Sequence, residues 1–261
     1  MRKGGTINSS IALSENVILR QRLGKFLRER PDIVPVNSFY TRAKSPYLVQ
    51  LPEEESLALY RFLGWIHGDG NMSGRRILIT DECFGYHETE IRDMFGRLFN
   101  LKPNIYEDRQ RHSYYSHIKS GVLYDYLVEV MEMPSGSVRQ QLTVPNYINE
   151  SSLELRAAYV GGLYDAEGHV KRRQSEIDFS ITSRSVQQVI SKTLGGLGID
   201  HSLHQRERSS IEYEVYIYGR DDVAKFRKHV AFVHPVKKIE LERSLTFALN
   251  TRVVPAVNDA S

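Results

Sequence analysis

A nine-residue motif occurs twice in this chain. FLGWIHGDG spans residues 62–70, and VGGLYDAEG spans residues 160–168. Each copy is a short apolar run that ends in a small residue, an acid and a glycine. The two acids, Asp69 and Glu167, are 98 positions apart (167 − 69 = 98). A repeat at this distance predicts two similar halves that each contribute one carboxylate to a shared site.

The 98-residue offset continues beyond the motif. Three later pairs of matching residues keep it: Leu101 and Ile199, Tyr115 and Tyr213, and Gly121 and Gly219. Apolar spacing predicts the same order in both halves, namely helix, hairpin, helix, hairpin and helix. Two such units, joined directly at Pro145-Asn146, predict one pseudo-symmetric α+β body, the single-chain counterpart of a symmetric dimer.

The expected elements follow from this pattern. In the first half, helices are expected from residue 57 until Asp69-Gly70 and at 87–99 and 122–131, with strands at 71–73, 76–80, 102–108 and 113–118. In the second half, helices are expected at 153–165, 186–197, 221–230 and 236–249, with strands at 170–173, 177–182, 201–206 and 211–218. The chain therefore divides into a basic extension at 1–51, a first half at 52–148, a second half at 149–250 and a disordered tail at 251–261.

The N-terminal extension carries most of the positive charge. Residues 1–50 hold nine Lys and Arg against three acids (9 − 3 = +6), whereas the whole chain sums to +3. Residues 1–13 show no period, a helix is expected from an N-cap at Ser14 until Pro31, and Pro35 and Pro46 predict an irregular stretch after it. The segment is either an extra DNA-contacting arm or a solvated basic helix face.

Composition excludes several classes of protein. The 261 residues are 41% hydrophobic and 26% charged, which is typical of a globular protein. A single cysteine, Cys83, excludes a disulfide framework and predicts a reducing compartment. No apolar run approaches the roughly 18 residues of a membrane span, and no signal-peptide core is present, so no membrane partner is expected. We expect an intracellular protein, in the cytoplasm of a prokaryote or alternatively in an organelle.

Small residues recur on one face of each motif: Gly64 and Gly68 in the first, and Gly161, Gly162 and Ala166 in the second. They would let the two helices pack closely and end side by side, with Asp69 facing Glu167. An acid at a helix C-terminus is disfavoured by the dipole, so two such acids argue against simple capping. Two close carboxylates need a cation, and ligands that are all oxygen favour a hard ion such as Mg²⁺, which can promote phosphodiester hydrolysis.

The two motifs resemble those of single-chain LAGLIDADG homing endonucleases, and the resemblance covers about residues 52–248. The variant with Asp in the first motif and Glu in the second resembles archaeal intron-encoded members. The resemblance implies a monomer of two αββαββα halves, whose strands form a saddle over the major groove of double-stranded DNA. It also implies double-strand breaks at long, roughly pseudo-palindromic sites, with Mg²⁺ as cofactor and Ca²⁺ or Mn²⁺ able to substitute in binding or assay.

The resemblance also assigns roles by position. Asp69 and Glu167 match the metal-binding acids, and the backbone carbonyls of Gly68 and Ala166 would complete the coordination. The residues that order water near the metals would be Asp81 in the first half and Ser183 in the second. Family members often have Gln or Asn at these two positions.

A basic residue near the scissile phosphate is also implied. The candidates are Lys237 and Lys238 in the second half, Arg139 in the first half, where Ser137 stands in place of a frequent Lys, and Lys171 just beyond the second motif. The difference between Ser137 and Lys237, together with that between Asp69 and Glu167, predicts two unequal strand-cutting sites.

The DNA-facing side follows from strand alternation. In the strand at 177–182, three residues should face the helices (Ile177, Phe179 and Ile181) and their neighbours should face DNA (Glu176, Asp178, Ser180 and Thr182). Carboxylates are awkward on a DNA surface, although one can accept from cytosine N4. Basic residues recur at strands and turns of both halves and predict phosphate and groove contacts: Arg75, Arg76, Arg109, Arg111, His112, Lys119, Arg172, Arg173, Arg206 and Arg208.

Two other functions suit the same fold. A maturase would help splice intron RNA, and retention of both acids does not exclude it. A catalytically inactive DNA-binding regulator would gain nothing from two mutually repelling carboxylates, so the intact acids count against it. The primary expectation is a Mg²⁺-dependent, site-specific DNA endonuclease.

Overall fold

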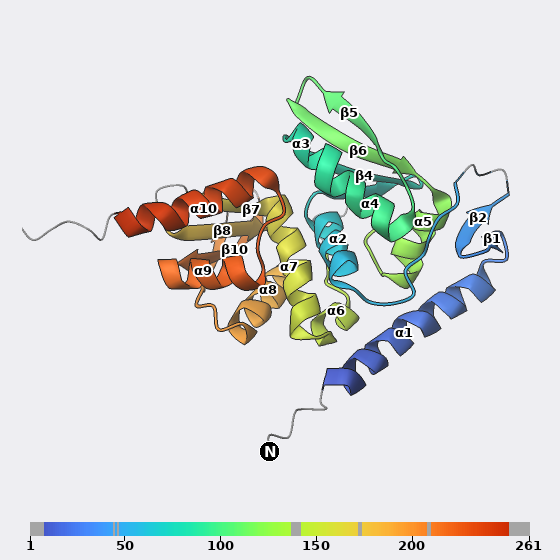
Figure 1. The fold of residues 1–261 in the computed structure, drawn as a ribbon, viewed down its shortest axis with the longest axis horizontal. Coiled ribbons are helices and arrows are strands. Elements are labelled where there is room, and N and C mark those ends of the chain that lie inside the picture. Colours follow the sequence, from blue (N-terminus) through green and yellow to red (C-terminus); the bar gives the residue numbers. More distant parts are fainter. Residues whose placement is uncertain are drawn as a thin grey trace, which may run out of the picture.

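The computed structural model describes residues 8–43, 45, 47–136, 142–171, 174–207 and 210–250. These residues form two four-stranded antiparallel sheets, the helices that pack on them and a small two-stranded hairpin (Figure 1). The strand orders are β3-β4-β6-β5 in one sheet and β7-β8-β10-β9 in the other. Because the two orders are equivalent, they confirm the predicted α+β fold of two pseudo-symmetric repeats.

The first half follows the predicted order closely. Its helical elements are α2 (Leu57–Gly68), α3 (Phe84–Tyr86), the π-helical turn η1 (His87–Ile91), α4 (Arg92–Phe99), α5 (Gly121–Asp125) and the π-helical turn η2 (Tyr126–Val130). Its strands are β3 (Gly70–Ser73), β4 (Arg76–Asp81), β5 (Asn104–Asp108) and β6 (Ser113–Lys119). The Ser56 hydroxyl starts α2 by accepting from the Leu59 amide at 3.1 Å, as an N-cap does.

The second half repeats this order. Its helices are α6 (Asn146–Glu150), α7 (Leu153–Glu167), α8 (Arg184–Gly196), α9 (Arg220–His229) and α10 (Pro235–Asn250), and its strands are β7 (Gly168–Lys171), β8 (Glu176–Ile181), β9 (Ser202–Glu207) and β10 (Ile211–Tyr218). The short helix α6 at the junction of the halves was not predicted. In β8 the predicted alternation is confirmed at Ile177 and Phe179, which are fully buried, whereas Ile181 is only partly buried.

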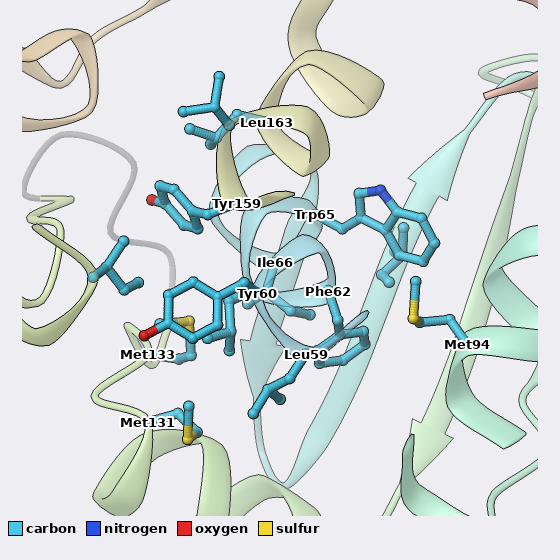
Figure 2. Close-up of a cluster of buried hydrophobic side chains, with 14 of the residues drawn as sticks. Leu59, Tyr60, Phe62, Trp65, Ile66, Met94, Met131, Met133, Tyr159 and Leu163 are labelled. Carbon is cyan, nitrogen blue, oxygen red and sulfur yellow. The ribbon is translucent and has the colours of Figure 1, made fainter. Parts of the chain in front are cut away.

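The two motif helices, α2 and α7, lie side by side at the centre of the molecule, with one sheet on each side (Figure 1). Figure 2 shows Tyr159 of α7 among the side chains of α2. The glycines make this contact possible: a Cβ on Gly64 would lie 2.2 Å from the Tyr159 carbonyl oxygen, and one on Gly162 would lie 2.1 Å from that of Arg61. The predicted close packing through small residues is therefore confirmed.

Two predictions for the N-terminal extension were wrong. Helix α1 (Asn8–Glu29) begins before Ser14, so residues 8–13 are helical. Residues 1–7 lie outside the described residues. Strands β1 (Ile33–Val36) and β2 (Phe39–Arg42) form a hairpin where an irregular stretch was expected. Pro35 is tolerated because this hairpin is a separate two-stranded sheet, where a strand keeps one edge unpaired.

The extension is docked on the first half. Leu19, Leu23 and Phe26 of α1 are buried. Four of its arginines pair with acids: Arg20 with Glu54, Arg22 with Glu132, Arg30 with Asp125 and Glu129, and Arg42 with Asp32 and Asp125. Most of these pairs join the extension to the first half, so much of its predicted surplus of positive charge is balanced within the protein.

The predicted disordered tail at 251–261 lies outside the described residues. Among the helices of the described ranges, none combines the length and the apolar character that crossing a membrane requires.

Candidate active site

Asp69 and Glu167 stand at the C-terminal ends of the two packed helices. Asp69 caps α2, with its N–H donating to the Trp65 carbonyl at 3.0 Å, and Glu167 is the last residue of α7. The helices touch just before these acids, since a Cβ on Gly68 would lie 2.3 Å from that of Ala166. The structure therefore places both acids at the junction of the two halves.

Three cavities surround this junction. The Asp69 cavity, about 620 Å³, is lined by Asp69, Thr80, Asp81, Glu82, Cys83, Ser113, Ala166, His169, His234, Val236, Lys237 and Glu240. The Glu167 cavity, about 260 Å³, is lined by His67, Gly68, Leu142, Glu167, Ser180, Ile181, Thr182 and Glu212. A bridging cavity of about 220 Å³ includes Gly68, Asp69 and Arg111. Each acid thus shares a cavity with the small residue of the other motif helix.

Lys237 caps the end of α7 from within the Asp69 cavity. Its Nζ donates to the carbonyls of Asp165 at 2.5 Å and Ala166 at 2.6 Å, and more weakly to that of Tyr164 at 3.3 Å. A cation is favoured at the negative end of a helix dipole. Burial lowers the pKa of Lys237, and the nearby carboxylates, Asp69 first among them, offset part of that effect. The ammonium group of Lys237 therefore lies beside the carbonyl end of α7 and close to the Asp69 carboxylate.

The other predicted phosphate-neighbouring residues lie elsewhere. Lys238 is exposed on the next position of α10. Lys171 lies on the second sheet, where it pairs with Glu176 and sits 5.8 Å from the centre of the Tyr216 ring. Neither lines one of the three cavities. Arg139 lies outside the described residues.

Asp81 forms a hydrogen-bonded pair with a residue of the other half. The Nε2 atom of His234 lies 3.1 Å from both carboxylate oxygens of Asp81, and the Cys83 amide donates to Oδ1 at 2.6 Å. Burial alone would raise the pKa of Asp81, but the hydrogen bond and charge of His234 outweigh it and hold that pKa below its usual range. Asp81 is thus an ionised acceptor in the Asp69 cavity. No role for His234 was predicted from the sequence.

Ser183, the predicted counterpart of Asp81, has a different environment. Its hydroxyl donates to the Leu142 carbonyl at 2.5 Å and accepts from the Val186 amide at 3.3 Å, which makes it the N-cap of α8. Ser183 is buried and lines none of the three cavities. The hydroxyl is therefore already engaged, and its role in ordering water stays a prediction.

Asp165 is a buried carboxylate that joins the halves. It is 0% exposed and accepts from Arg61 Nε at 2.8 Å and Trp65 Nε1 at 3.1 Å, both on α2. It also accepts from the backbone amides of Val233 and His234 at 2.9 and 3.1 Å. A buried charge needs such partners. Asp165 thereby holds the loop before α10, and with it Lys237, against the motif helices.

His67 occupies the matching position of the first motif (165 − 67 = 98). It is 2% exposed, and its Nδ1 lies 2.5 Å from the hydroxyl of Tyr159. Its Nε2 has no hydrogen-bond partner within the described part of the chain. Burial lowers the pKa of His67 to about 3, so the ring is neutral at physiological pH. His67 and Asp165 were not predicted as site residues, although a polar residue in an apolar motif helix could have marked both.

The outer face of the first sheet is basic and aromatic. Arg76 of β4 lies opposite Lys119 of β6, and Tyr106 of β5 stacks on Tyr115 of β6 at 5.3 Å. The remaining predicted contacts lie at turns, Arg75 between β3 and β4, and Arg109, Arg111 and His112 between β5 and β6. The side chains of Arg109 and Arg111 are 87% and 82% exposed, as contact with phosphates would require.

The outer face of the second sheet is acidic. Four carboxylates lie on adjacent strands: Glu176 and Asp178 on β8, and Glu212 and Glu214 on β10. Lys171 pairs with Glu176, and Arg206 lies 3.5 Å from Glu214. Lys171, predicted near the scissile phosphate, and Arg206, predicted as a DNA contact, are thus each paired with an acid of their own sheet. Arg172, Arg173 and Arg208 lie outside the described residues.

The donor set suits a hard divalent cation only with help from a substrate. Within the described ranges, no three His, Cys, Asp or Glu side chains gather into a metal site. Each cavity instead offers one of the two motif acids beside the end of a motif helix. Further carboxylates line both cavities: Asp81, Glu82 and Glu240 in the Asp69 cavity, and Glu212 in the Glu167 cavity. Mg²⁺-like ions accept such sparse sets because they keep several waters and take ligands from phosphates. The Ala166 carbonyl assigned to the metal also accepts from Lys237 Nζ, so a cation there would lie beside this lysine.

Comparison with known proteins adds a family match. Residues 154–231, most of the second half, match the model of a LAGLIDADG-like domain. Among curated proteins, the chain is 26% identical over 202 residues to a glutamine–fructose-6-phosphate aminotransferase of Methanocaldococcus jannaschii. It is 23% identical over 258 residues to the tRNA-splicing ligase RtcB of Methanopyrus kandleri. These matches cover 76% and 87% of this chain but span only 18% and 26% of the two relatives.

Solved structures share the fold. I-DmoI in complex with DNA and Mn is similar with a TM-score of 0.50 and 21% identity, over 67% of this chain and 96% of that one. Another I-DmoI complex contains DNA and Ca. Full-length DUF199/WhiA from Thermotoga maritima is similar with a TM-score of 0.55 and 13% identity, over 94% of this chain and 69% of that one. The second half of this chain thus matches a LAGLIDADG-like domain, and the chain has the fold of the LAGLIDADG homing endonucleases.

Proposed function

We propose that this protein is a site-specific, divalent-metal-dependent endonuclease of the single-chain LAGLIDADG type that cuts both strands of DNA. One observation carries the proposal. Asp69 and Glu167 end two helices that abut at Gly68 and Ala166, and each acid opens into a cavity with the small residue of the other helix. This crossed arrangement offers two related cation sites, one for each strand of a duplex.

Different residues of the chain would serve separate roles in hydrolysis. A divalent ion such as Mg²⁺, when bound, lowers the pKa of a water molecule and neutralises charge on a phosphate. Asp69 and Glu167, with the carbonyls of Gly68 and Ala166, would hold it. Lys237 presents an ammonium group to the same cavity as Asp69, where it can stabilise charge that develops on a phosphoryl oxygen. The basic face of the first sheet would hold the duplex above this junction.

Sequences similar to this chain occur within proteins of different function, which supports the proposal that the chain is a mobile genetic module. The two curated relatives, an aminotransferase and an RNA ligase by name, share no common chemistry, and the chain spans about a fifth to a quarter of each. A segment found within unrelated proteins behaves as an insertion. We therefore propose homing as the biological role, with the archaeal intron-encoded type, a monomeric state and an intracellular location as parts of this proposal.

The proposal is tested by cleavage of a randomised-site DNA library. We expect a defined subset of sequences to be cut in Mg²⁺ and to be bound but not cut in Ca²⁺. Asp69→Asn and Glu167→Gln should each lower cleavage by more than about 10³-fold, since each removes a charge needed to hold a cation, while binding of the selected site in Ca²⁺ stays within about tenfold. Undiminished cutting by both variants would refute the role of the acids.

A DNA-binding regulator is the second candidate. It is favoured by the similarity to WhiA, which extends over 94% of this chain. The same library separates the two functions, because a regulator would enrich a binding site without cutting it in any divalent metal. In that case Asp69→Asn would leave every measured property of the complex unchanged.

A further inference from the structure

The strand register gives Asp81 an apolar counterpart in the second half. Ile79 of β4 lies opposite the glycine that ends the first motif, and Phe179 of β8 lies opposite the glycine that ends the second. Two residues further on, the two strands end at Asp81 and Ile181. Asp81 lines the Asp69 cavity, and Ile181 lines the Glu167 cavity. At equivalent positions, one cavity therefore has a carboxylate and the other has an isoleucine.

His234, the residue before α10, donates a hydrogen bond to Asp81 across the junction of the two halves. Its Nδ1 accepts from the Lys237 N–H at 3.4 Å, so a neutral ring carries its proton on Nε2. Nε2 lies 3.1 Å from both carboxylate oxygens of Asp81, and an ionised carboxylate can only accept. The partners of the two ring nitrogens therefore agree on the direction of the bond.

The pair is held in place on several sides. The backbone N–H of His234 donates to the Asp165 carboxylate at 3.1 Å, and its ring packs against Tyr86 with the ring centres 4.5 Å apart. The side chain of His234 is only 6% exposed, whereas that of Asp81 is 13% exposed and reaches the cavity. His234 is therefore an internal support, and Asp81 is the member of the pair that a ligand in the cavity can touch.

The Asp81 carboxylate keeps an acceptor for such a ligand. Its two oxygens offer about four lone-pair positions. The Cys83 amide donates to Oδ1 at 2.6 Å, and the His234 N–H is shared between Oδ1 and Oδ2. Oδ2 accepts no other hydrogen bond from the part of the chain that the structure describes. A water molecule in the Asp69 cavity can therefore donate to Oδ2, whereas Ile181 offers no acceptor to a water in the Glu167 cavity.

We propose that His234 is a positioning residue, which holds the Asp81 carboxylate so that it orients the attacking water in the Asp69 cavity alone. The water oxygen bonds to phosphorus while the bond from phosphorus to one sugar oxygen breaks. One water proton is released to solvent, and the departing sugar oxygen takes one up. By accepting from this water, Asp81 turns a lone pair of the water toward phosphorus, which removes part of the orientational cost of the reaction.

This inference rests on the proposed endonuclease function. The family resemblance implies water ordering at position 81, but the dependence on His234 and the restriction to one cavity follow from the contacts of this chain. They predict that one DNA strand is nicked with the help of a residue pair that joins the two halves, and that the other strand is nicked without it.

Strand-resolved nicking tests this role. The selected duplex is labelled at one end of either strand, and single-turnover rates are measured for each strand in Mg²⁺. We expect His234→Leu to slow one strand by about 10²-fold, the same strand that Lys237→Met slows, and the other by less than about threefold. His234→Gln should recover the affected strand to within about tenfold of wild type, because its terminal amide keeps an N–H near the original Nε2 position.

A histidine elsewhere in the second half provides the matched control. His201 is partly buried, lies 2.8 Å from the Ser191 hydroxyl through its Nε2, and lines none of the three cavities. His201→Leu should leave the nicking rates of both strands unchanged. Strand-selective slowing by His201→Leu equal to that by His234→Leu would overturn the proposal, because the loss would then not depend on Asp81.

A double variant shows whether the two residues act through the same water. Asp81→Ile, which copies the second half, should slow the same strand as His234→Leu by about 10²–10³-fold. Because His234 acts only through Asp81, adding His234→Leu to Asp81→Ile should slow that strand by less than about threefold more. Multiplication of the two single effects would overturn the proposal.

Three other results would also overturn it. His234→Leu could slow both strands alike, or His234→Gln could be no faster than His234→Leu. Asp81→Asn could raise the Mg²⁺ concentration for half-maximal nicking by more than about tenfold, which would make Asp81 a ligand of the cation. If wild type cuts and Asp69→Asn does not, the endonuclease function stands whatever His234 does, so the two failures are distinguishable.

A second measurement keeps the proposal testable if His234→Leu does not fold. Nitrogen NMR of the ¹⁵N-histidine-labelled full chain reports which ring nitrogens carry protons, and loss of a signal in His234→Gln identifies His234. We expect Nε2 of His234 to be protonated in wild type. A proton on Nδ1 alone would overturn the proposed bond to Asp81.

Discussion

The two halves share a backbone arrangement but differ in the polar groups around their acids. Position 165 holds an aspartate bonded to both halves, whereas the matched position 67 holds a histidine whose Nε2 has no hydrogen-bond partner among the described residues. The Asp69 cavity contains Lys237 and the Asp81–His234 pair, and the Glu167 cavity contains neither. The outer sheet faces differ as well, basic in the first half and acidic in the second. The two halves thus share their helix packing and strand order, but they differ in the polar and charged side chains around the two acids.

The largest expected effect concerns Asp165, which is fully hydrogen-bonded, unlike His67 at the matched position of the first half. Asp165→Ala should lower the free energy of unfolding by about 3–5 kcal/mol, because the partly buried Arg61 guanidinium and the buried Trp65 indole both lose the carboxylate that accepts from them, although Arg61 keeps its bonds to the carbonyls of Val230 and Ala231. Urea denaturation measures this change. The exposed pair Asp93–Arg97 offers a control, since Asp93→Ala should cost less than about 1 kcal/mol. Equal losses in the two variants would mean that Asp165 does not join the halves.

The next prediction distinguishes the two cavities by the rates at which the two DNA strands are nicked. Lys237→Met should slow nicking of one strand by about 10²–10³-fold and the other by much less, since Lys237 lines only the Asp69 cavity. Lys238→Met should have the smaller effect because Lys238 is exposed and lies outside the cavities. Single-turnover assays with separately labelled strands measure both. Equal slowing of the two strands by Lys237→Met would contradict the division between the cavities.

A third prediction concerns what the halves share. Gly162→Ala should lower the free energy of unfolding by about 1–3 kcal/mol, because its Cβ would lie 2.1 Å from the Arg61 carbonyl oxygen and force the motif helices apart. Gly195→Ala, on α8, is the matched control. It meets nothing within 4 Å and should be neutral or stabilise by up to about 1 kcal/mol. Thermal melts compare the two, and destabilisation by both would point to backbone strain in place of the helix contact.

The smallest effect compares the two sheets. Arg76→Ala and Lys119→Ala should each reduce the salt dependence of DNA affinity by a slope of about 1, since each removes one phosphate-type contact. Lys171→Ala and Arg206→Ala should reduce it less, because both cations are already paired with acids of their own sheet. Affinity titrations across a range of salt in Ca²⁺ measure the slopes. Equal reductions would mean that both faces contact DNA alike.

Local patterns predicted most elements correctly and failed where a contact overrode propensity. The apolar spacing of the motif helices and the alternation in β8 are local properties that tertiary packing reinforces. The β1–β2 hairpin was missed because Pro35 signals irregular chain, yet it is accepted in a strand with a free edge. The early start of α1 was missed because residues 8–13 show no apolar period.

The duplicated motif by itself determined the central features of this protein. Its glycines require two helices in close contact, and its placement 98 residues apart requires two matching halves with an acid at each helix end. Only the tertiary structure decided what surrounds those acids. Lys237 and His234 reach the junction from α10 and the loop before it, far from both motifs in sequence, and Arg61 of the first motif helix bonds Asp165 of the second. Hydrogen bonds between distant segments leave no periodic trace in a sequence, because they depend on direction and distance in the folded chain.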